Sequence, residues 1–489
     1  MGALVRRSST QYVMVLVLAG TLAIGGVRPA LAEQLPTLGG AGGGLLSSQQ
    51  EAAIAEHVMR SLRKTMPVLR DPLLEDYLSS VVYNLVPHVQ LNNRDLTLVI
   101  LDDPAINAFA VPGRIIGVNA GLFLHAETEQ QFVSVMAHEL AHLSQRHFAR
   151  RMEQQERAAP MALAGMVAGI ILSAVTRSDI GLAAIAGSQA LAIQNMLQYS
   201  RLNEQEADRV GLEIMAKAGY DPDAMPRMFG QMLRRARLQG DRPPEYLSTH
   251  PLTESRVSDT QNRAAQYPKG SRGDSLEYHL MRARALVKYA QSASDAVKTF
   301  EEQLEKPGSE KNAALRYGLA IALQADNRAE EAIGILEGLL EDHPGHISLV
   351  VTLASAELTL DKLDQAADRL EQALRRSPGN VPLQSKLAEV RMAQNRPEAA
   401  ARLYEKLTRN DPQNSQIWQR LADAQVESRN IVEVHRARAE YELLMSNPER
   451  AEMHLREAIN RAQGNLQVQE ALRNRLQEVL ARIDQSGER

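Results

Sequence analysis

The stretch FVSVMAHELAHLSQRH, residues 132–147, places two histidines and a glutamate in an apolar run with helical spacing. His138 and His142 are four residues apart, so on a helix both imidazoles lie on one face and can bind the same metal ion. Glu139 lies about 100° round the helix from His138, beside that ion, where a general base can take a proton from water. The pattern predicts a metal-dependent hydrolase; the alternative is a helix with a coincidental motif.

A catalytic metal site of this type needs a third protein ligand. The metzincin spacing is absent, because Gln145 and Phe148 stand where a glycine and a third histidine would be. His147 is nine residues from His138, half a turn out of phase on a continuous helix, so we expect it to face away from the ion. A carboxylate from a second helix is the remaining candidate.

The segment YSRLNEQEADRVGLEIMAKAGYDP, residues 199–222, supplies such a carboxylate. Glu204 and Asp208 are four residues apart, so we expect Glu204 to bind the metal and Asp208, one turn on, to accept a hydrogen bond from a ligand histidine. Glu206 lies about 200° round the helix from Glu204 and is expected to be solvated or paired with an arginine. Taken alone, the segment also fits an acidic amphipathic helix.

The ligand types indicate which metal to expect. Two imidazoles and one carboxylate with one open position suit a single zinc ion best, and other divalent ions fit less well. In this arrangement the metal polarises a carbonyl group, and Glu139 moves protons between water and the leaving group. No covalent intermediate with the protein is needed.

The first 32 residues have the pattern of an export signal, with Arg6 and Arg7 before an apolar run and Ala30 and Ala32 at signal-peptidase spacing. We expect cleavage after Ala32. A permanent membrane anchor is the alternative, but the apolar run 13–24 is short of the ~20 residues that span a bilayer. The chain has no cysteine, so it has neither disulfides nor a lipid-carrying thiol. These features predict a periplasmic protein.

The composition is that of a folded chain of 489 residues, 44% hydrophobic and 23% charged. A net charge of −4 gives no basic field, which argues against nucleic-acid binding. We expect a flexible leader at residues 33–46 and a metallopeptidase domain at 47–268. The Gly- and Pro-containing stretch at 267–274 marks a boundary, and an all-helical domain at 275–489 follows.

Helices are expected at residues 48–66 and 72–86. The β-rich runs at 96–103 and 114–121 are expected to pair as strands and to lead into the histidine helix. The strand at 114–121 could line the cleft and pair with an extended substrate. The fold class is therefore α+β and mainly α, with a zincin-like domain containing a small β-sheet.

The apolar stretch at residues 161–197 is too short and too polar for a membrane-spanning hairpin. A self-packed helical hairpin is the favoured interpretation, because Gly and Ala allow helices to pack closely. A lid, or a surface that makes peripheral contact with a membrane, is the alternative.

A 34-residue period dominates the chain after the boundary and is typical of tetratricopeptide repeats. Small residues recur where paired helices cross, and proline recurs where the second helix ends. We expect about four repeats and a capping helix, forming a solenoid that binds peptides or partner proteins. The recurring residues are Ala320, Ala354, Ala388 and Ala422; Ala332, Ala366 and Ala400; and Pro344, Pro378 and Pro412.

Four motifs, NAFAVPGRIIGVNAGL, HELAH, SRLNEQEAD and STHPLTESR, occur in an order that resembles the metallopeptidase family of the CAAX prenyl proteases and HtpX-like proteases. The resemblance covers about residues 48–265. It implies a zinc metalloendopeptidase of the gluzincin type, with zinc held by His138, His142 and Glu204. Glu139 is then the base, and Asp208 lies behind the ligands.

The same resemblance places His250 and Arg256, from STHPLTESR, near the active site. Either side chain could stabilise the oxyanion of the reaction, or His250 could occupy the open zinc position and hold the enzyme shut. Without the resemblance, His250 would be read as a turn residue before Pro251.

With the export signal and the repeats included, the whole chain resembles the periplasmic members of this family. The resemblance implies cleavage of misfolded or misassembled outer-membrane β-barrel proteins and chaperone-like assistance to assembly, with the barrel-insertion machinery as a partner of the repeats. The alternative is a periplasmic assembly chaperone or scaffold whose metal site is gated or largely inactive. An intramembrane or prenyl-peptide protease is disfavoured, because too little apolar length follows the signal.

Overall fold

The computed structural model describes residues 48–154, 201–239 and 246–487. The expected export signal, the leader and the apolar stretch at 161–197 lie outside these residues. Within the described residues, no helix combines the length and the apolar character that crossing a membrane requires.

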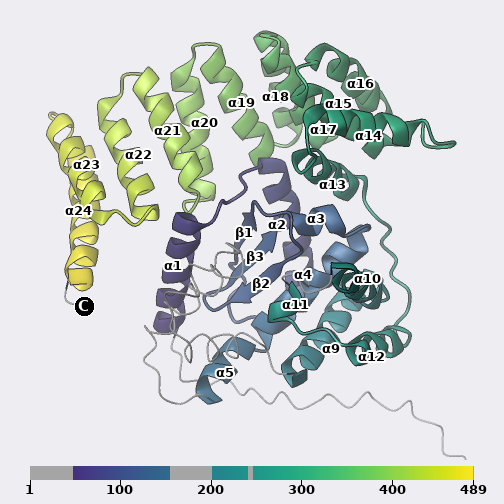
Figure 1. The fold of residues 1–489 in the computed structure, drawn as a ribbon. Coiled ribbons are helices and arrows are strands. Elements are labelled where there is room, and N and C mark those ends of the chain that lie inside the picture. The colour runs from purple at the N-terminus through teal and green to yellow at the C-terminus, as the bar shows by residue number, and fades with distance from the viewer. Residues whose placement is uncertain (1–47, 155–200, 240–245, 488–489) are drawn as a thin grey trace, which may run out of the picture. The chain divides into compact units, whose positions relative to one another are not determined.

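The peptidase part is built from helices around one small sheet (Figure 1). Helices expected at 48–66 and 72–86 are confirmed as α1 and α2. The elements are α1 (Ser48–Thr65), α2 (Pro72–Leu85), η1 (Val86–His88), β1 (Thr97–Leu101), β2 (Ala108–Val111), β3 (Ile115–Asn119), α3 (Gly121–His125), α4 (Glu129–Ser144), α5 (His147–Gln154), α9 (Arg201–Lys217), α10 (Ala224–Gln239), α11 (Tyr246–Thr249) and α12 (Glu254–Ala264).

The sheet has the strand order β1-β3-β2, with β1 parallel and β2 antiparallel to β3. The two expected strands do pair, but β2 was not expected as a strand. Gly117 in β3 is required by close packing, since a Cβ there would lie 2.0 Å from Cζ of Phe109. Because β3 is the central strand, the expectation that it offers an edge to an extended substrate is wrong.

Helix α4 carries the HELAH motif through the interior. Its N-terminus is fixed by a capping box, in which Thr128 and Gln131 satisfy each other's backbone N–H groups. Every residue from Glu129 to His142 is buried, so the helix is covered on all sides. The motif therefore sits on a rigid element rather than on a loop.

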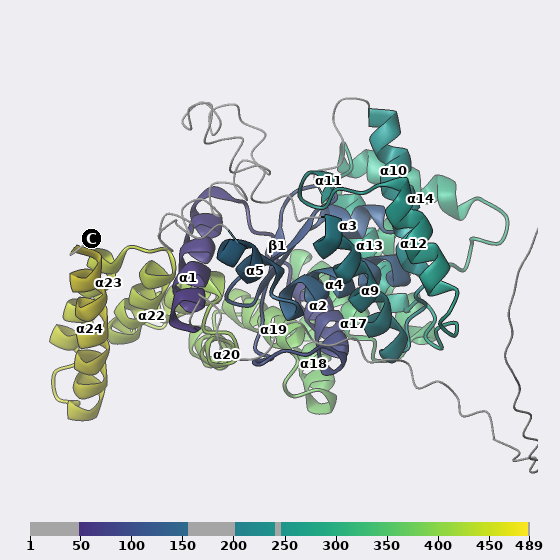
Figure 2. The ribbon, with the colours of Figure 1, turned by 90° about the horizontal axis from the view of Figure 1, so that it is seen from below.

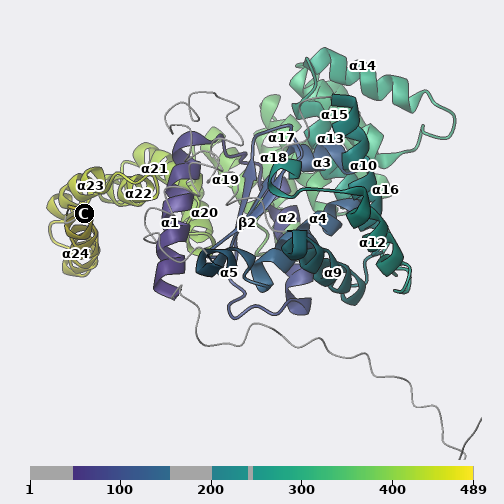
Figure 3. The same ribbon diagram turned by 60° about the horizontal axis from the view of Figure 1, so that its bottom comes forward.

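Helix α9 packs directly against α4 (Figure 3). Glu204, Asp208 and Gly211 follow one another on one buried face of α9, at the i, i+4, i+7 spacing of a core-facing stripe. A Cβ on Gly211 would lie 2.9 Å from the Met225 methyl group and 3.4 Å from the backbone nitrogen of His138. Glycine thus lets the two helices approach closely where the site is formed.

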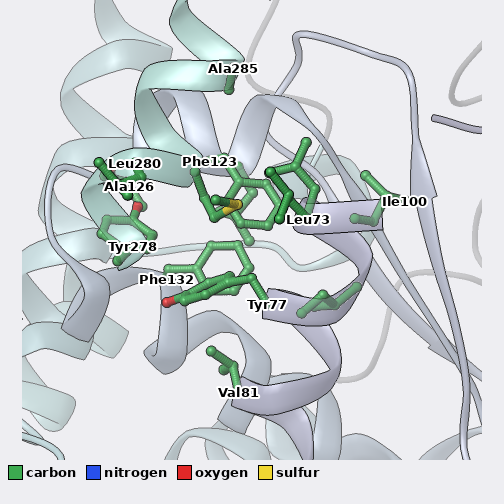
Figure 4. Packing of buried hydrophobic residues seen from close by; sticks show 14 of the residues in the cluster. Leu73, Tyr77, Val81, Ile100, Phe123, Ala126, Phe132, Tyr278, Leu280 and Ala285 are labelled. Atoms are coloured by element: carbon green, nitrogen blue, oxygen red, sulfur yellow. Dashed lines mark hydrogen bonds between the residues drawn. The ribbon is translucent and has the colours of Figure 1, made fainter. Parts of the chain in front are cut away.

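An aromatic cluster joins the peptidase part to the helix that follows it (Figure 4). Tyr77 of α2 lies within 6 Å of Phe123, Phe132 and Tyr278, measured between ring centroids. Tyr278 belongs to α13 (Leu276–Lys288) and donates a hydrogen bond of 2.7 Å to Ala126 O. The first helix after the expected boundary therefore packs into the peptidase core.

Helices α13 to α24 form consecutive pairs within residues 276–487, and the pairs continue beyond the four repeats expected. The turn inside each central pair contains a residue in the left-handed region, at Asn327, Asp361, Asn395 and Arg429, again 34 residues apart. The helices are α14 (Ala293–Leu304), α15 (Ala313–Ala325), α16 (Ala329–Asp342), α17 (Ile347–Thr359), α18 (Leu363–Arg376), α19 (Val381–Ala393), α20 (Pro397–Asn410), α21 (Ser415–Glu427), α22 (Ile431–Leu444), α23 (Pro448–Arg461) and α24 (Leu466–Gly487).

Helix α1 lies beside the repeat helices α20 and α22 (Figure 2). Polar contacts connect the repeats to α1 and to the start of α2. Arg63 of α1 donates to Leu444 O at 3.2 Å and to Gln413 O at 2.9 Å. Asp71 caps α2 with Oδ1 and accepts from Arg284 of α13 with Oδ2. The array is thus bound to the peptidase part at two separate helices.

We predict that Gly211→Val lowers the free energy of unfolding by about 1–3 kcal/mol, because the side chain overlaps α4 and Met225. Thermal unfolding followed by circular dichroism measures this loss. The matched control is Gly334→Val, on an exposed face of α16 where a Cβ meets no atom within 4 Å. Equal melting temperatures for the two variants would contradict the proposed close approach of α9 to α4.

Candidate metal centre

Four buried side chains from three separate segments converge beside α4. His138 and His142 come from α4, Glu204 from α9, and His250 from the residue after α11. Each offers a ligand atom, and these atoms all lie within 4.8 Å of one another. The cluster joins the three metal ligands expected from the sequence to the histidine whose role the sequence left open.

The distances between these atoms are short. Nε2 of His142 lies 3.0 Å from Nε2 of His138 and 3.3 Å from Oε1 of Glu204. Nδ1 of His250 lies 3.2 Å from the same Glu204 oxygen. Because all four side chains are at most 2% exposed, the cluster is shielded from solvent.

Asp208 lies where the sequence predicts it, behind a histidine of the cluster. Its Oδ1 is 3.1 Å from Nδ1 of His138. A carboxylate in this position keeps the proton of the imidazole on Nδ1 and turns the Nε2 lone pair toward the centre of the cluster.

Arg256 contacts two carboxylates of α9, those of Asp208 and Glu204. Its Nε and Nη2 donate to the two oxygens of Asp208 at 2.8 and 2.7 Å, and Nη1 lies 2.8 Å from Oε2 of Glu204. Nη1 also donates to Pro251 O, and the guanidinium lies over the Phe229 ring. With all three nitrogens engaged, this geometry gives no support to Arg256 as an oxyanion donor; the residue holds the carboxylates in place instead.

His147 contacts the cluster from behind, a contact the sequence analysis missed. Its Nδ1 lies 2.8 Å from Nδ1 of His142, and its Nε2 lies 3.1 Å from Oε2 of Glu206. The extrapolation along one helix failed because α4 ends at Ser144 and Arg146 turns into the left-handed region with φ 51°. His147 is outside the four-residue cluster, as expected, but it is not turned away from it.

One arrangement of protons satisfies both contacts of His147. If His147 donates from Nε2 to Glu206, its Nδ1 accepts the Nδ1 proton of His142, and Nε2 of His142 is then unprotonated, as binding a cation requires. Burial lowers the pKa of His147 to about 4, so the ring is neutral as this arrangement requires. Glu206 also pairs with Arg150 at 2.6 Å, in agreement with the expected arginine partner.

Glu139 and Tyr246 complete the interior of the site. Both carboxylate oxygens of Glu139 are buried without a hydrogen-bond partner among the described residues, and Oε1 lies 3.6 Å from Nε2 of His250. The Tyr246 ring stacks on His250, with centroids 4.6 Å apart and an angle of 22° between the planes. Burial and the Glu139 and Glu204 carboxylates raise the pKa of Tyr246 well above its usual value, so its hydroxyl keeps its proton.

The electrostatics of the cluster favour a bound cation. Burial lowers the pKa of His138, but Asp208 and Glu204 raise it overall, to about 9. Despite burial, His250 and His142 hold the pKa of Glu204 well below its usual range. When a bound cation takes the place of the proton on His138, the histidines are neutral, and three buried carboxylates (Glu139, Glu204, Asp208) and the Arg256 guanidinium leave a charge of −2. The donor set therefore fits a divalent metal ion.

Comparisons with known proteins agree with this geometry. The model for peptidase family M48 matches residues 72–264, and a tetratricopeptide repeat model matches residues 289–356 and 358–424. The first match contains α4, α9 and His250. The two later matches fall on the helix pairs that show the 34-residue period.

The similar proteins include bacterial proteases and a mitochondrial metalloendopeptidase of a plant. The β-barrel assembly-enhancing protease of Escherichia coli K12 is 36% identical over 336 residues, which is 68% of this chain and 69% of that protein. A Vibrio cholerae relative is 38% identical over 321 residues, or 65% of this chain and 66% of that one. The mitochondrial metalloendopeptidase OMA1 of Arabidopsis thaliana is 30% identical over 159 residues, covering 32% of this chain and 30% of the relative. The two bacterial matches span about two thirds of those proteins.

We predict that His147→Phe weakens metal binding by about 10- to 100-fold, because the ring that orients His142 is lost while the cluster itself is kept. Competition with a chromogenic chelator measures the affinity. The matched control is Glu213→Gln on α9, an exposed carboxylate paired with Lys217, which should bind metal like the wild type. An unchanged affinity in His147→Phe would show that the contact with His142 has no orienting role.

Proposed function

The chain belongs to peptidase family M48, and on that premise we propose that it is an exported zinc-dependent endopeptidase that hydrolyses misfolded or misassembled outer-membrane β-barrel proteins. The observation that carries the proposal is the buried cluster of His138, His142, Glu204 and His250 with Glu139 beside it. The family and the cluster support a peptidase. The substrate class is carried over from the names of the bacterial relatives.

Zinc is the metal that we propose for the cluster. Donors about 2.0–2.1 Å from a tetrahedral zinc ion lie roughly 3.3 Å from one another. The distances from Nε2 of His142 to Nε2 of His138, 3.0 Å, and to Oε1 of Glu204, 3.3 Å, are close to this value. His138, His142 and Glu204 would hold the ion, and Asp208, Arg256 and His147 would keep these ligands oriented.

Bound zinc supplies a Lewis acid that polarises the scissile carbonyl and makes water a stronger nucleophile at neutral pH. Glu139 accepts a proton from the attacking water and delivers it to the leaving amine. Its two unpaired oxygens suit this task, because neither is held by a competing hydrogen bond among the described residues. The buried site keeps other water away from the reacting groups.

His250 supports a gated site. Its Nδ1 lies 3.2 Å from Glu204 and its Nε2 lies 3.6 Å from Glu139, so the ring would fill the open position of an ion held by His138, His142 and Glu204. A fourth protein ligand closes a zinc site that needs an open position for catalysis. We therefore propose that the structure represents a closed state and that His250 must swing away before a peptide can bind, rather than serve as the oxyanion donor.

The repeat module, which we place at residues 275–489 after a peptidase domain at 47–268, would recruit substrate or the barrel-insertion machinery. Recruitment raises the effective concentration of a target at a weakly selective cleft. Where the array packs beside α2 its side chains are already in contact with one another: the buried Tyr317 hydroxyl contacts Arg284 and Thr352. Partner binding is therefore proposed for surfaces of the array away from α2.

Export to the periplasm through the signal at residues 1–32 is part of the proposal, since outer-membrane barrel proteins pass through that compartment. We also propose that residues 161–197 make peripheral contact with the membrane. Neither segment belongs to the described residues. The relatives' name also supports an assembly-assisting activity alongside proteolysis.

A scaffold or assembly chaperone with a gated metal site is the second candidate. The position of His250 inside the cluster favours it, because a closed site does not cleave. In that case the repeats would carry the function, and Glu139 would be dispensable in the cell.

We predict that Glu139→Gln keeps the bound zinc and loses about 10²- to 10⁴-fold in kcat/KM on an unfolded β-barrel protein, because the proton acceptor is lost. Zinc is quantified by atomic emission, and cleavage is followed by gel electrophoresis. His250→Ala, measured beside it, should cleave faster than wild type if the ring closes the site. Slower cleavage by His250→Ala would assign this histidine to oxyanion stabilisation instead.

If wild type, Glu139→Gln and His250→Ala all bind zinc and none cleaves an unfolded substrate, the scaffold replaces the protease as the proposed function. The cellular test is complementary. A protease requires Glu139 for outer-membrane quality control, whereas a scaffold functions equally well with Gln at this position.

We predict that the mature protein begins at Glu33, because the signal peptidase cuts after Ala32. Mass spectrometry of the N-terminal peptide from a periplasmic extract measures the cleavage site. Recovery of a chain that still carries residues 1–32 in the membrane fraction would indicate an anchor in place of a cleaved signal.

A further inference from the structure

Tyr246 carries a buried hydroxyl that the proposed mechanism does not use. The residue is 1% exposed, and its Oη has no hydrogen-bond partner among the described residues. A buried polar group without a partner is unfavourable and uncommon in a folded protein. A partner gained during the reaction would remove this cost.

The hydroxyl is at the reaction site. The Tyr246 ring stacks on His250, and its centroid is 6.3 Å from that of His138. Burial, and after it the Glu139 and Glu204 carboxylates, raise the pKa of the Tyr246 hydroxyl well above its usual value. Tyr246 therefore lies beside a metal ligand and beside the general base at the same time.

The backbone holds Tyr246 in this place independently of the His250 side chain. Its N–H donates to Ile106 O at 3.2 Å, in the loop that leads into β2, and its carbonyl accepts from the N–H of His250 at 2.8 Å. The His250 ring can thus rotate about its own side-chain bonds while the tyrosine remains anchored.

Peptide hydrolysis places negative charge on the carbonyl oxygen, and a fixed donor aimed at that oxygen accelerates the reaction. The sequence offered Arg256 and His250 for this task. Arg256 is fully engaged by Asp208, Glu204 and Pro251, and His250 belongs to the metal cluster. Among the described residues beside the cluster, Tyr246 is a buried donor whose hydroxyl has no hydrogen-bond partner.

We propose that the Tyr246 hydroxyl donates a hydrogen bond to the carbonyl oxygen of the scissile peptide bond and stabilises the negative charge that develops there. This role rests on the proposed endopeptidase function. A tyrosine hydroxyl, with an ordinary pKa of about 10, is protonated and able to donate at neutral pH.

The test is Tyr246→Phe, which removes the hydroxyl and keeps the ring that packs on His250. Both wild type and His250→Ala serve as backgrounds, so that a closed site does not mask the effect. We expect kcat to fall by about 10²- to 10³-fold with little change in KM and with zinc content unchanged. Binding of a phosphinic peptide, which mimics the tetrahedral state, should weaken by a similar factor.

Two further measurements separate this role from a structural one. In a Glu139→Gln background, Tyr246→Phe should leave the affinity for an uncleaved peptide unchanged. The melting temperature should stay equal or rise, because an unpaired buried hydroxyl is removed. The matched control is Tyr278→Phe, whose hydroxyl donates to Ala126 O in the aromatic cluster; it should lower the melting temperature and leave kcat unchanged.

If Tyr246→Phe changes neither kcat nor phosphinic-peptide affinity, or lowers both only in step with the melting temperature, the oxyanion role is overturned. The endopeptidase function would still stand in that case, provided that Glu139→Gln is inactive. If Glu139→Gln cleaves like the wild type, the proposed function itself fails, and the two failures are told apart by this one comparison.

Discussion

The close contact between α4 and α9 is the constraint on which the site depends. It buries three carboxylates and a guanidinium in a place without solvent, where every charge needs a partner. Arg256 pairs with Asp208 and Glu204, Asp208 faces His138, and the remaining negative charge suits a divalent cation. Gly211 favours the contact, because a Cβ there would lie 2.9 Å from the Met225 methyl group and 3.4 Å from the His138 nitrogen of α4.

The same helix also connects the site to the rest of the chain. Glu129, the first residue of α4, accepts hydrogen bonds from the Tyr77 hydroxyl and from the N–H of Ser275, just before α13. The HELAH motif lies further along the same buried helix. The peptidase elements and the start of the repeat array therefore share one core, and the sequence boundary at 267–274 separates two composition types rather than two independently packed bodies.

Much of the site could be predicted because helices fix the direction of nearby side chains. The four-residue spacings of His138 with His142 and of Glu204 with Asp208 are confirmed as shared faces of α4 and α9. Extrapolation failed where a helix ended: the break after Ser144 brings His147 against His142. Strand β2 was missed because Ala-Phe-Ala-Val is too short to show alternation, although it decides which strand is central.

The sequence by itself predicted the two helices that carry the cluster, Glu139 beside it, the 34-residue repeat and, through four ordered motifs, the family. Only the tertiary structure decided that His250 enters the cluster, that Arg256 turns toward carboxylates instead of substrate, and that Tyr246 presents an unpaired hydroxyl there. The physical reason is the distance along the chain over which each kind of signal acts. Helical periodicity sets side-chain direction within one element, whereas contacts between residues about 46 or more positions apart depend on how the elements pack.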